Sequence, residues 1–161
     1  MRQVAFNNLI SDNPMASFAE VLSKRFGDLN NKRVKAGWFP SSQYPGTNEP
    51  VAAVALVQEF GDPINHIPPR PFMRPAAERA KKEMGAVVRG VIVNHDSQET
   101  LETMGVTMQA MIVDAIVDVT TPELSDRTLA ARQARGNSSA KPLNDSGQMM
   151  AEVNHEIVDN D

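Results

Sequence analysis

The stretch QEFGDPINHIPPRPFMRP, residues 58–75, decides how this chain folds. Because proline fixes φ and lacks an N–H donor, this segment can form neither a helix interior nor a central strand. Its prolines are Pro63, Pro68, Pro69, Pro71 and Pro75. We expect a stiff, extended proline-rich strap over residues 62–74. Its apolar side chains, Ile64, Ile67, Phe72 and Met73, need a surface to cover in the same chain or in a neighbour.

Helical patterns flank the strap on both sides. Residues 51–60, VAAVALVQEF, fit a short buried helix or a strand. Their alanine content and Gly61, a residue suited to the position just past a helix end, favour the helix. After the strap, Pro75 suits the first turn of a long helix that continues to about residue 95. Gly85 and Gly90 weaken this helix and indicate either close packing of another backbone or a bend.

A second long helix is predicted from about Ser97 to Val119. Its apolar residues recur at spacings of three and four, and they include Met104, Met108 and Met111. A stripe of this kind is typical of core packing rather than of a cofactor site.

Shorter elements are predicted toward both ends. Asn13 and Pro14 suit the start of an amphipathic helix that reaches about Leu29, after an arm over residues 1–12. Alternating apolar residues predict a strand over residues 33–39, which places the single tryptophan on a face of the sheet.

Toward the C-terminus, Ser125 suits the N-cap of a short helix. Residues 40–50 are expected to form a polar loop, and residues 133–146 a flexible one. Alternation from Ala151 to Ile157 predicts a terminal strand with one polar face. Together the elements predict one α+β domain over residues 1–161, with a small antiparallel sheet packed against two or three helices and extended proline-rich and polar loops.

Composition narrows the class of protein. The 161 residues are ordinary for a soluble domain, with 41% hydrophobic and 22% charged side chains. The net charge of −4 gives no support to a general DNA-binding face. The absence of cysteine excludes disulfides and thiolate chemistry. We see neither a signal-peptide-like start nor an apolar run of membrane-spanning length, and we expect no membrane association.

The sequence shows no arrangement of residues that indicates catalysis. The histidines do not share a helix face at the spacing of a metal site, and they are His66, His95 and His155. Asp114 and Asp118 lie one helical turn apart but suit a solvated edge. Ser146 has no nucleophile setting. We therefore expect no catalytic, metal or cofactor site, and a protein that is not an enzyme.

Four motifs, in order, resemble a known family. They are EFG at residues 59–61, IPPRPFMR at 67–74, LSDRT at 124–128 and KPLNDSG at 141–147. Their order and spacing are similar to those of the tail-completion, or head–tail joining, proteins of tailed bacteriophages, akin to the lambda minor tail protein Z and the phage virion-morphogenesis proteins. The resemblance covers about residues 51–158. Here Ser146 stands where the family usually has threonine, and Asn144 where it has an aliphatic residue.

The resemblance implies a structural virion protein without catalysis. Such a protein forms a homo-oligomeric, six-fold ring in the phage neck, assembled in the host cytoplasm. Its expected partners are portal or adaptor and tail proteins of the same phage, with DNA passing through the lumen without sequence-specific binding. The alternatives are a tail terminator ring and an assembly factor that is absent from the virion. An enzyme acting on cell wall or nucleic acid is a further rival.

Eight residues are candidates for contacts between subunits. We expect Arg70 and Arg74 to pair with carboxylates, and Phe72 and Met73 to anchor the strap on a neighbour. Packing of the strap within its own chain is an equal alternative. The full set of interface candidates is Phe60, Ile67, Arg70, Phe72, Met73, Arg74, Leu143 and Met149.

Overall fold

The computed structural model describes residues 31–92 and 97–160, together with five residues nearer the N-terminus. The predicted arm over residues 1–12 and the predicted helix start at Asn13 and Pro14 lie outside the described residues. The five described residues of that predicted helix are helical, and they are Glu20, Ser23, Phe26, Gly27 and Leu29.

The chain is an α+β fold, as the sequence predicts. Over residues 32–92 and 97–160 it contains two strands and five helices. In chain order they are β1 (Lys32–Gly37), α2 (Val51–Phe60), α3 (Met73–Ile92), α4 (Ser97–Asp118), α5 (Asp126–Ala134), α6 (Gln148–Ala151) and β2 (Asn154–Asp159).

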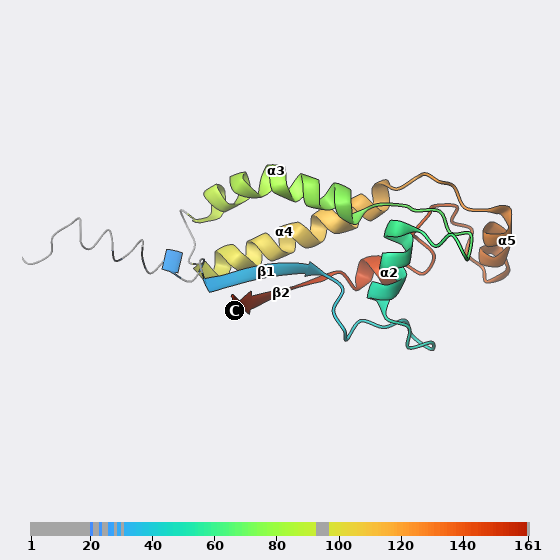
Figure 1. Cartoon of the computed structure of the whole chain (residues 1–161), viewed down its shortest axis with the longest axis horizontal. Helices are drawn as coiled ribbons and strands as arrows, with labels where there is room; N and C mark the ends of the chain where they lie inside the picture. Colours follow the sequence, from blue (N-terminus) through green and yellow to red (C-terminus); the bar gives the residue numbers. More distant parts are fainter. Residues whose placement is uncertain are drawn as a thin grey trace, which may run out of the picture.

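The two strands form an antiparallel sheet, and helix α4 covers one of its faces. The register pairs Lys32 with Asp159 at one end and Gly37 with Asn154 at the other. Helix α4 packs against both strands, and α3 packs on α4, so that sheet, α4 and α3 form three successive layers (Figure 1). Helices α2, α5 and α6 lie at one end of the molecule, beyond the end of the sheet where Gly37 pairs with Asn154 (Figure 1).

A close contact joins α4 to the sheet. The ring of His155 on β2 lies against the backbone of α4 at Gly105, so closely that any Cβ at this position would overlap the ring. The ring is held from both sides, because Nδ1 bonds to Oε1 of Gln109 and Nε2 lies 2.9 Å from Oε2 of Glu102. Gly105 therefore sets how closely helix and sheet approach.

We expect Gly105→Ala to destabilise the domain by about 1–3 kcal/mol, because overpacking forces the held imidazole to move. Urea unfolding followed by circular dichroism measures the change. Gly85→Ala on α3 is the matched control. A Cβ there would meet nothing nearer than the Arg89 side chain at 3.5 Å, so the gain in helix propensity should stabilise by up to about 1 kcal/mol. Equal effects of the two variants would contradict this account.

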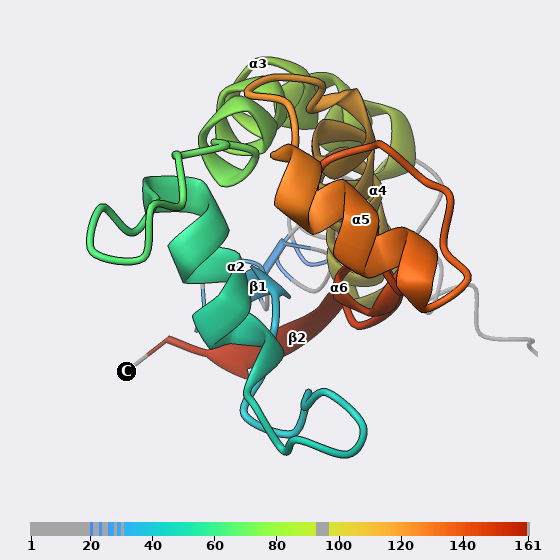
Figure 2. The same cartoon turned by 90° about the vertical axis from the view of Figure 1, so that its right-hand side faces the viewer.

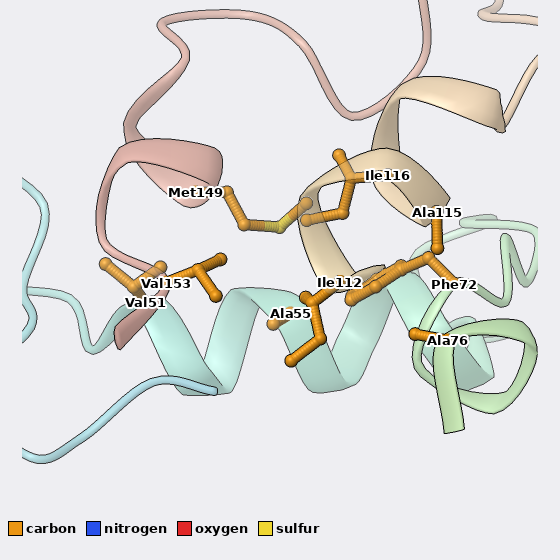
Figure 3. Close-up of a cluster of buried hydrophobic side chains, with 9 residues drawn as sticks. All are labelled: Val51, Ala55, Phe72, Ala76, Ile112, Ala115, Ile116, Met149 and Val153. Carbon is orange, nitrogen blue, oxygen red and sulfur yellow. The ribbon is translucent and has the colours of Figure 1, made fainter. Parts of the chain in front are cut away.

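The hydrophobic core lies where α2, α4, α6 and the start of α3 meet. Phe72 and Val51 are fully buried there, and Ile116 is nearly so. The rings of Trp38 and Phe72 form a T-shaped pair with 5.7 Å between centroids, and Trp38 Nε1 donates to the Met149 carbonyl at 2.8 Å. Figure 3 draws the cluster of Val51, Ala55, Phe72, Ala76, Ile112, Ala115, Ile116, Met149 and Val153.

Most predicted elements are confirmed, with small shifts of their ends. The helix interpretation of residues 51–60 is correct, and Ser125 caps α5 by accepting a hydrogen bond from the Thr128 amide. The strand predicted at 33–39 runs from Lys32 to Gly37. The long helix after the strap begins at Met73 and is described to Ile92. Close packing of another backbone at Gly85 or Gly90 is not found among the described residues.

The predicted start of the terminal strand is wrong. Gly147 adopts a left-handed conformation with φ of 77° and opens the short helix α6, so Ala151 is helical and β2 begins only at Asn154. Only the last four of the alternating residues 151–157 belong to β2, which continues to Asp159. The helix places Met149 in the core, 4% exposed.

Helix α4 is long and apolar enough, by length and composition, to cross a membrane, although no such run was expected. Four of its large apolar side chains are buried inside the fold, and they are Leu101, Met111, Ile112 and Ile116. The predicted core role of Met111 is thereby confirmed, whereas Met104 and Met108 are half-buried. Packing on both strands and on α3 accounts for the buried part of this apolar surface, whereas Val106 and Val117 are exposed.

Candidate interaction surface

The glutamate of the EFG motif joins α2 to α3. Glu59 is the single charged residue of α2, and it is 7% exposed. Its Oε2 accepts hydrogen bonds from the amides of Phe72 at 2.7 Å and Met73 at 2.9 Å, and its Oε1 accepts one from Arg74 at 3.3 Å. A carboxylate suits this place, because the first amides of a helix lack partners and carry partial positive charge.

The glycine of the motif is required by the strap. Gly61 has φ of 77°, and a Cβ there would lie 2.8 Å from the Ile67 carbonyl oxygen and from the Pro69 nitrogen. Residues with a side chain rarely adopt this positive φ, and backbone atoms of the strap fill the space that a Cβ would need. The strap can therefore cross the end of α2 only over a glycine.

The strap is not extended throughout, which corrects the sequence interpretation. Residues 62–67 fold back, with the amide of each end residue donating to the carbonyl of the other, at 2.8 Å and 2.9 Å. Asp62 Oδ1 accepts from the amides of Ile64 and Asn65. An aspartate that binds amides two and three residues ahead favours a turn over an extended chain. Ile64 lies in this turn, 90% exposed.

Hydrogen bonds from the side chain and amide of Asn65, and to a lesser degree the one from the Ile64 amide, lower the pKa of Asp62 below its ordinary value of 3.8. We expect a carbon-13 NMR titration of the Asp62 carboxyl to give a midpoint below 3.8, and Asn65→Ala to raise that midpoint. Since the folded pKa is lowered, the turn is most stable above pH 3.8 and loosens as the pH falls through the folded value. A midpoint that Asn65→Ala leaves unchanged would contradict the assignment.

The arginine of the strap is an internal tie. Arg70 is 5% exposed, and its Nε and Nη2 donate to the carbonyls of Pro122 at 2.8 Å and Glu123 at 3.0 Å. Burial, and to a lesser degree the charge of Arg132, lowers the pKa of Arg70. The expected pairing of Arg70 with a carboxylate is therefore wrong, because backbone carbonyls at the α4–α5 connection take that place. The Arg74 side chain is exposed at the start of α3.

A second buried arginine organises the loop that follows α5. The Nη1 of Arg132 lies within hydrogen-bonding distance of the carbonyl oxygens of Ser139, Lys141 and Asn144, at 3.0, 2.8 and 3.1 Å. Asn137 donates to Asp145, and Arg135 pairs with the same aspartate at 2.7 Å. The segment expected to be flexible, residues 133–146, begins with the end of α5 and has no regular secondary structure after Ala134, yet side-chain bonds tie it together at many points.

An open groove of about 1000 Å³ lies between α2, the strap, α5 and the turn before α6. Tyr44, Arg70, Arg132 and Asp145 contribute polar atoms to its lining. Burial raises the pKa of Tyr44, and the charges of Glu49 and Asp145 add to that shift. Within the described ranges 31–92 and 97–160, no cluster of three or more His, Asp or Glu side chains is placed to hold a metal ion.

The outer face of α2 is entirely apolar. Its four exposed residues are Ala52, Ala53, Leu56 and Phe60, and the last two are 60% and 62% exposed. Leu56 and Phe60 are one turn apart and share a face. The helix is thus reversed from the usual surface pattern, since its glutamate is buried and its large apolar side chains are in solvent. Exposed apolar surface of this kind is characteristic of a contact with another molecule.

The eight interface candidates fall into three groups, which are buried, partly buried and exposed. Three candidates are buried inside the subunit, and they are Arg70, Phe72 and Met149. For these residues the structure agrees with the alternative, packing within the chain. Met73 and Leu143 are partly buried against the core cluster, and Ile67 is half-buried. Phe60 and Arg74 are exposed and remain available to a partner.

Sequence reasoning did not single out Leu56 as a contact residue, and it treated Ile64 only as an anchor of the strap. A signal for Leu56 existed, because α2 has apolar residues around its whole circumference. A helix with that pattern is normally covered on all sides.

Comparison with known proteins gives no relative: no family model matches the sequence, and neither a curated protein nor a solved structure matches it.

Proposed function

We propose that this chain is a structural subunit of the neck of a tailed bacteriophage. It forms a ring that completes the tail, joins it to the head connector and leaves a channel for DNA. The observation that carries the proposal is the outer face of α2, where every exposed residue is apolar and the charged one is buried. A subunit that works through contacts with other proteins needs such a face.

The four motifs that suggest the family also have coherent places in the fold. Glu59 and Gly61 fix the strap against α3, Arg70 ties it to the α4–α5 connection, and Ser125 caps α5. Gly147 opens α6 with its left-handed conformation. These residues hold one end of the molecule rigid, which suits a part that must fit its neighbours in a fixed geometry.

The net charge of −4 is compatible with a lumen that lets DNA pass. Phosphate contacts made by clustered Lys and Arg would retain the duplex instead. Tight, salt-sensitive binding of duplex DNA by the purified protein would contradict this part of the proposal.

Two measurements test the proposal as a whole. Electron microscopy of the purified full chain should show annular particles with an open centre, and mass spectrometry of purified virions of the phage that encodes it should detect its peptides. Rings that are absent from virions would indicate an assembly factor. A chain that is monomeric and absent from virions would remove the proposal.

A further inference from the structure

Helix α4 carries a second apolar face that is exposed in the subunit. Val106 and Val117 are 58% and 43% exposed, and Ala110 between them is also exposed. Spacings of four and seven residues place all three on one side of a helix. We call residues Val106, Ala110 and Val117 the α4 stripe, and Leu56 and Phe60 the α2 face.

The α2 face and the α4 stripe point in different directions. The two helices meet in the core through Val51 and Ala55 on one and Ile112 and Ile116 on the other. At 3.6 residues per turn, the α2 face lies roughly 140° around its helix from Val51 and Ala55.

By the same measure, the α4 stripe lies roughly 120° around its own helix from Ile112 and Ile116. Each face is thus directed away from the contact between the two helices. Figure 2 shows α2 and α4 on different sides of the molecule. One subunit cannot bring the two faces together.

The two faces also differ in shape. The α2 face presents a leucine and a phenylalanine, which project from the helix. The α4 stripe presents two valines and an alanine, whose smaller side chains leave room for large side chains of another molecule. Glu102 and Asp114 are exposed beside the stripe, and Asp114 lies 3.6 Å from Arg79, so polar groups border an apolar centre. An apolar centre with a polar rim is the usual anatomy of a protein interface.

We infer that the occupant of the α2 face is the α4 stripe of a second copy of this chain. The contact is head to tail, because it joins two different surfaces, and every further copy adds the same contact. Closure into a ring rests on the proposed function, and in a closed ring no subunit leaves either face in water. A two-fold dimer through the α2 face alone would leave the α4 stripe exposed in both copies.

The test uses full-length chains with one face disabled. Leu56→Asp removes the α2 face and Val106→Asp removes the α4 stripe; both residues are exposed, so the fold should persist by circular dichroism. Ala86→Asp, an exposed alanine on α3, is the control with the same added charge. Light scattering with size exclusion gives the mass of each sample at equal concentration.

We expect the wild type and Ala86→Asp to assemble, and each face variant to be monomeric, with association at least about 30-fold weaker. The decisive sample is an equal mixture of the two face variants. One intact α2 face and one intact α4 stripe remain in it, so it should give dimers and nothing larger. Dimers of Val106→Asp alone would indicate a two-fold contact through the α2 face and overturn the inference.

The remaining outcomes separate the inference from the proposed function. If the wild type and both face variants all form rings, the proposed function is supported and the inferred contact between the α2 face and the α4 stripe is wrong. If the wild type stays monomeric at about 100 µM, where even weak contacts are populated, the inferred contact is wrong, and the proposed function is wrong as well if virions lack the protein. Binding of the wild type to phosphatidylglycerol vesicles that Leu56→Asp abolishes would assign the α2 face to a lipid surface instead.

Discussion

Phe72→Asp is expected to unfold the subunit. The ring is fully buried between α2, α4 and α3, and Trp38 meets it edge to face. Removing a buried phenylalanine ring costs about 3–5 kcal/mol. The aspartate adds an unpaired charge in an apolar site, and the total is comparable with the 5–15 kcal/mol that stabilises an ordinary domain. Circular dichroism at 25 °C should show loss of helix, with no cooperative thermal transition.

Phe60→Asp is the matched control, because it makes the same replacement twelve residues earlier on an exposed site. We expect its thermal transition to stay within a few degrees of the wild type and its assembly to fail. A folded Phe72→Asp subunit that has lost only its assembly would contradict the core role of Phe72, and would restore the strap as a contact between subunits.

Glu59→Ala is expected to have the second-largest effect. Three amides at the start of α3 lose their acceptor, and the site is too buried for water to replace it fully. Loss of a helix cap costs about 0.5–2 kcal/mol, and a buried unsatisfied donor about 1–3 kcal/mol. We expect the free energy of unfolding in urea to fall by about 2–4 kcal/mol. Hydrogen exchange should show that the first turn of α3 loses protection before the rest of the helix.

Glu59→Gln separates the charge from the hydrogen bonds. The amide keeps one oxygen that can accept from the Phe72 and Met73 amides, but it loses the charge that interacts with the positive helix end. We expect a loss of free energy that is about half that of the alanine variant. If Glu59→Ala changes stability by less than about 0.5 kcal/mol, the carboxylate does not hold α3 as described.

Much of the fold could be predicted because local signals agree with the tertiary structure. Helix α4 has a long apolar periodicity and packs on three elements, so pattern and packing coincide. Ser125 caps α5 with its own side chain, an interaction that spans three residues and is visible in sequence. The short helix α6 was missed because the same residues alternate as a strand would, and the left-handed Gly147 decides between the two.

The candidate surface was harder to predict, because burial depends on contacts that are distant in sequence. Arg70 looked like a surface charge, yet it reaches carbonyls more than fifty residues away. Glu59 gave no sign of being buried, since its partners lie beyond the strap. Asp62 offers a local signal, because an aspartate can accept hydrogen bonds from the amides two and three residues ahead. This signal predicts the turn, whereas the five prolines alone suggest an extended chain.

The bond pattern of Glu59 has a mechanical consequence. Helix α2 exposes Leu56 and Phe60 on its outer side. On its inner side, the carboxylate of Glu59 accepts hydrogen bonds from three amides at the start of α3. A force on the outside of α2 is therefore transmitted to the first turn of α3, a helix of twenty residues. A neighbour bound to Leu56 and Phe60 would therefore act on the start of α3 as well as on α2, through the three hydrogen bonds of Glu59.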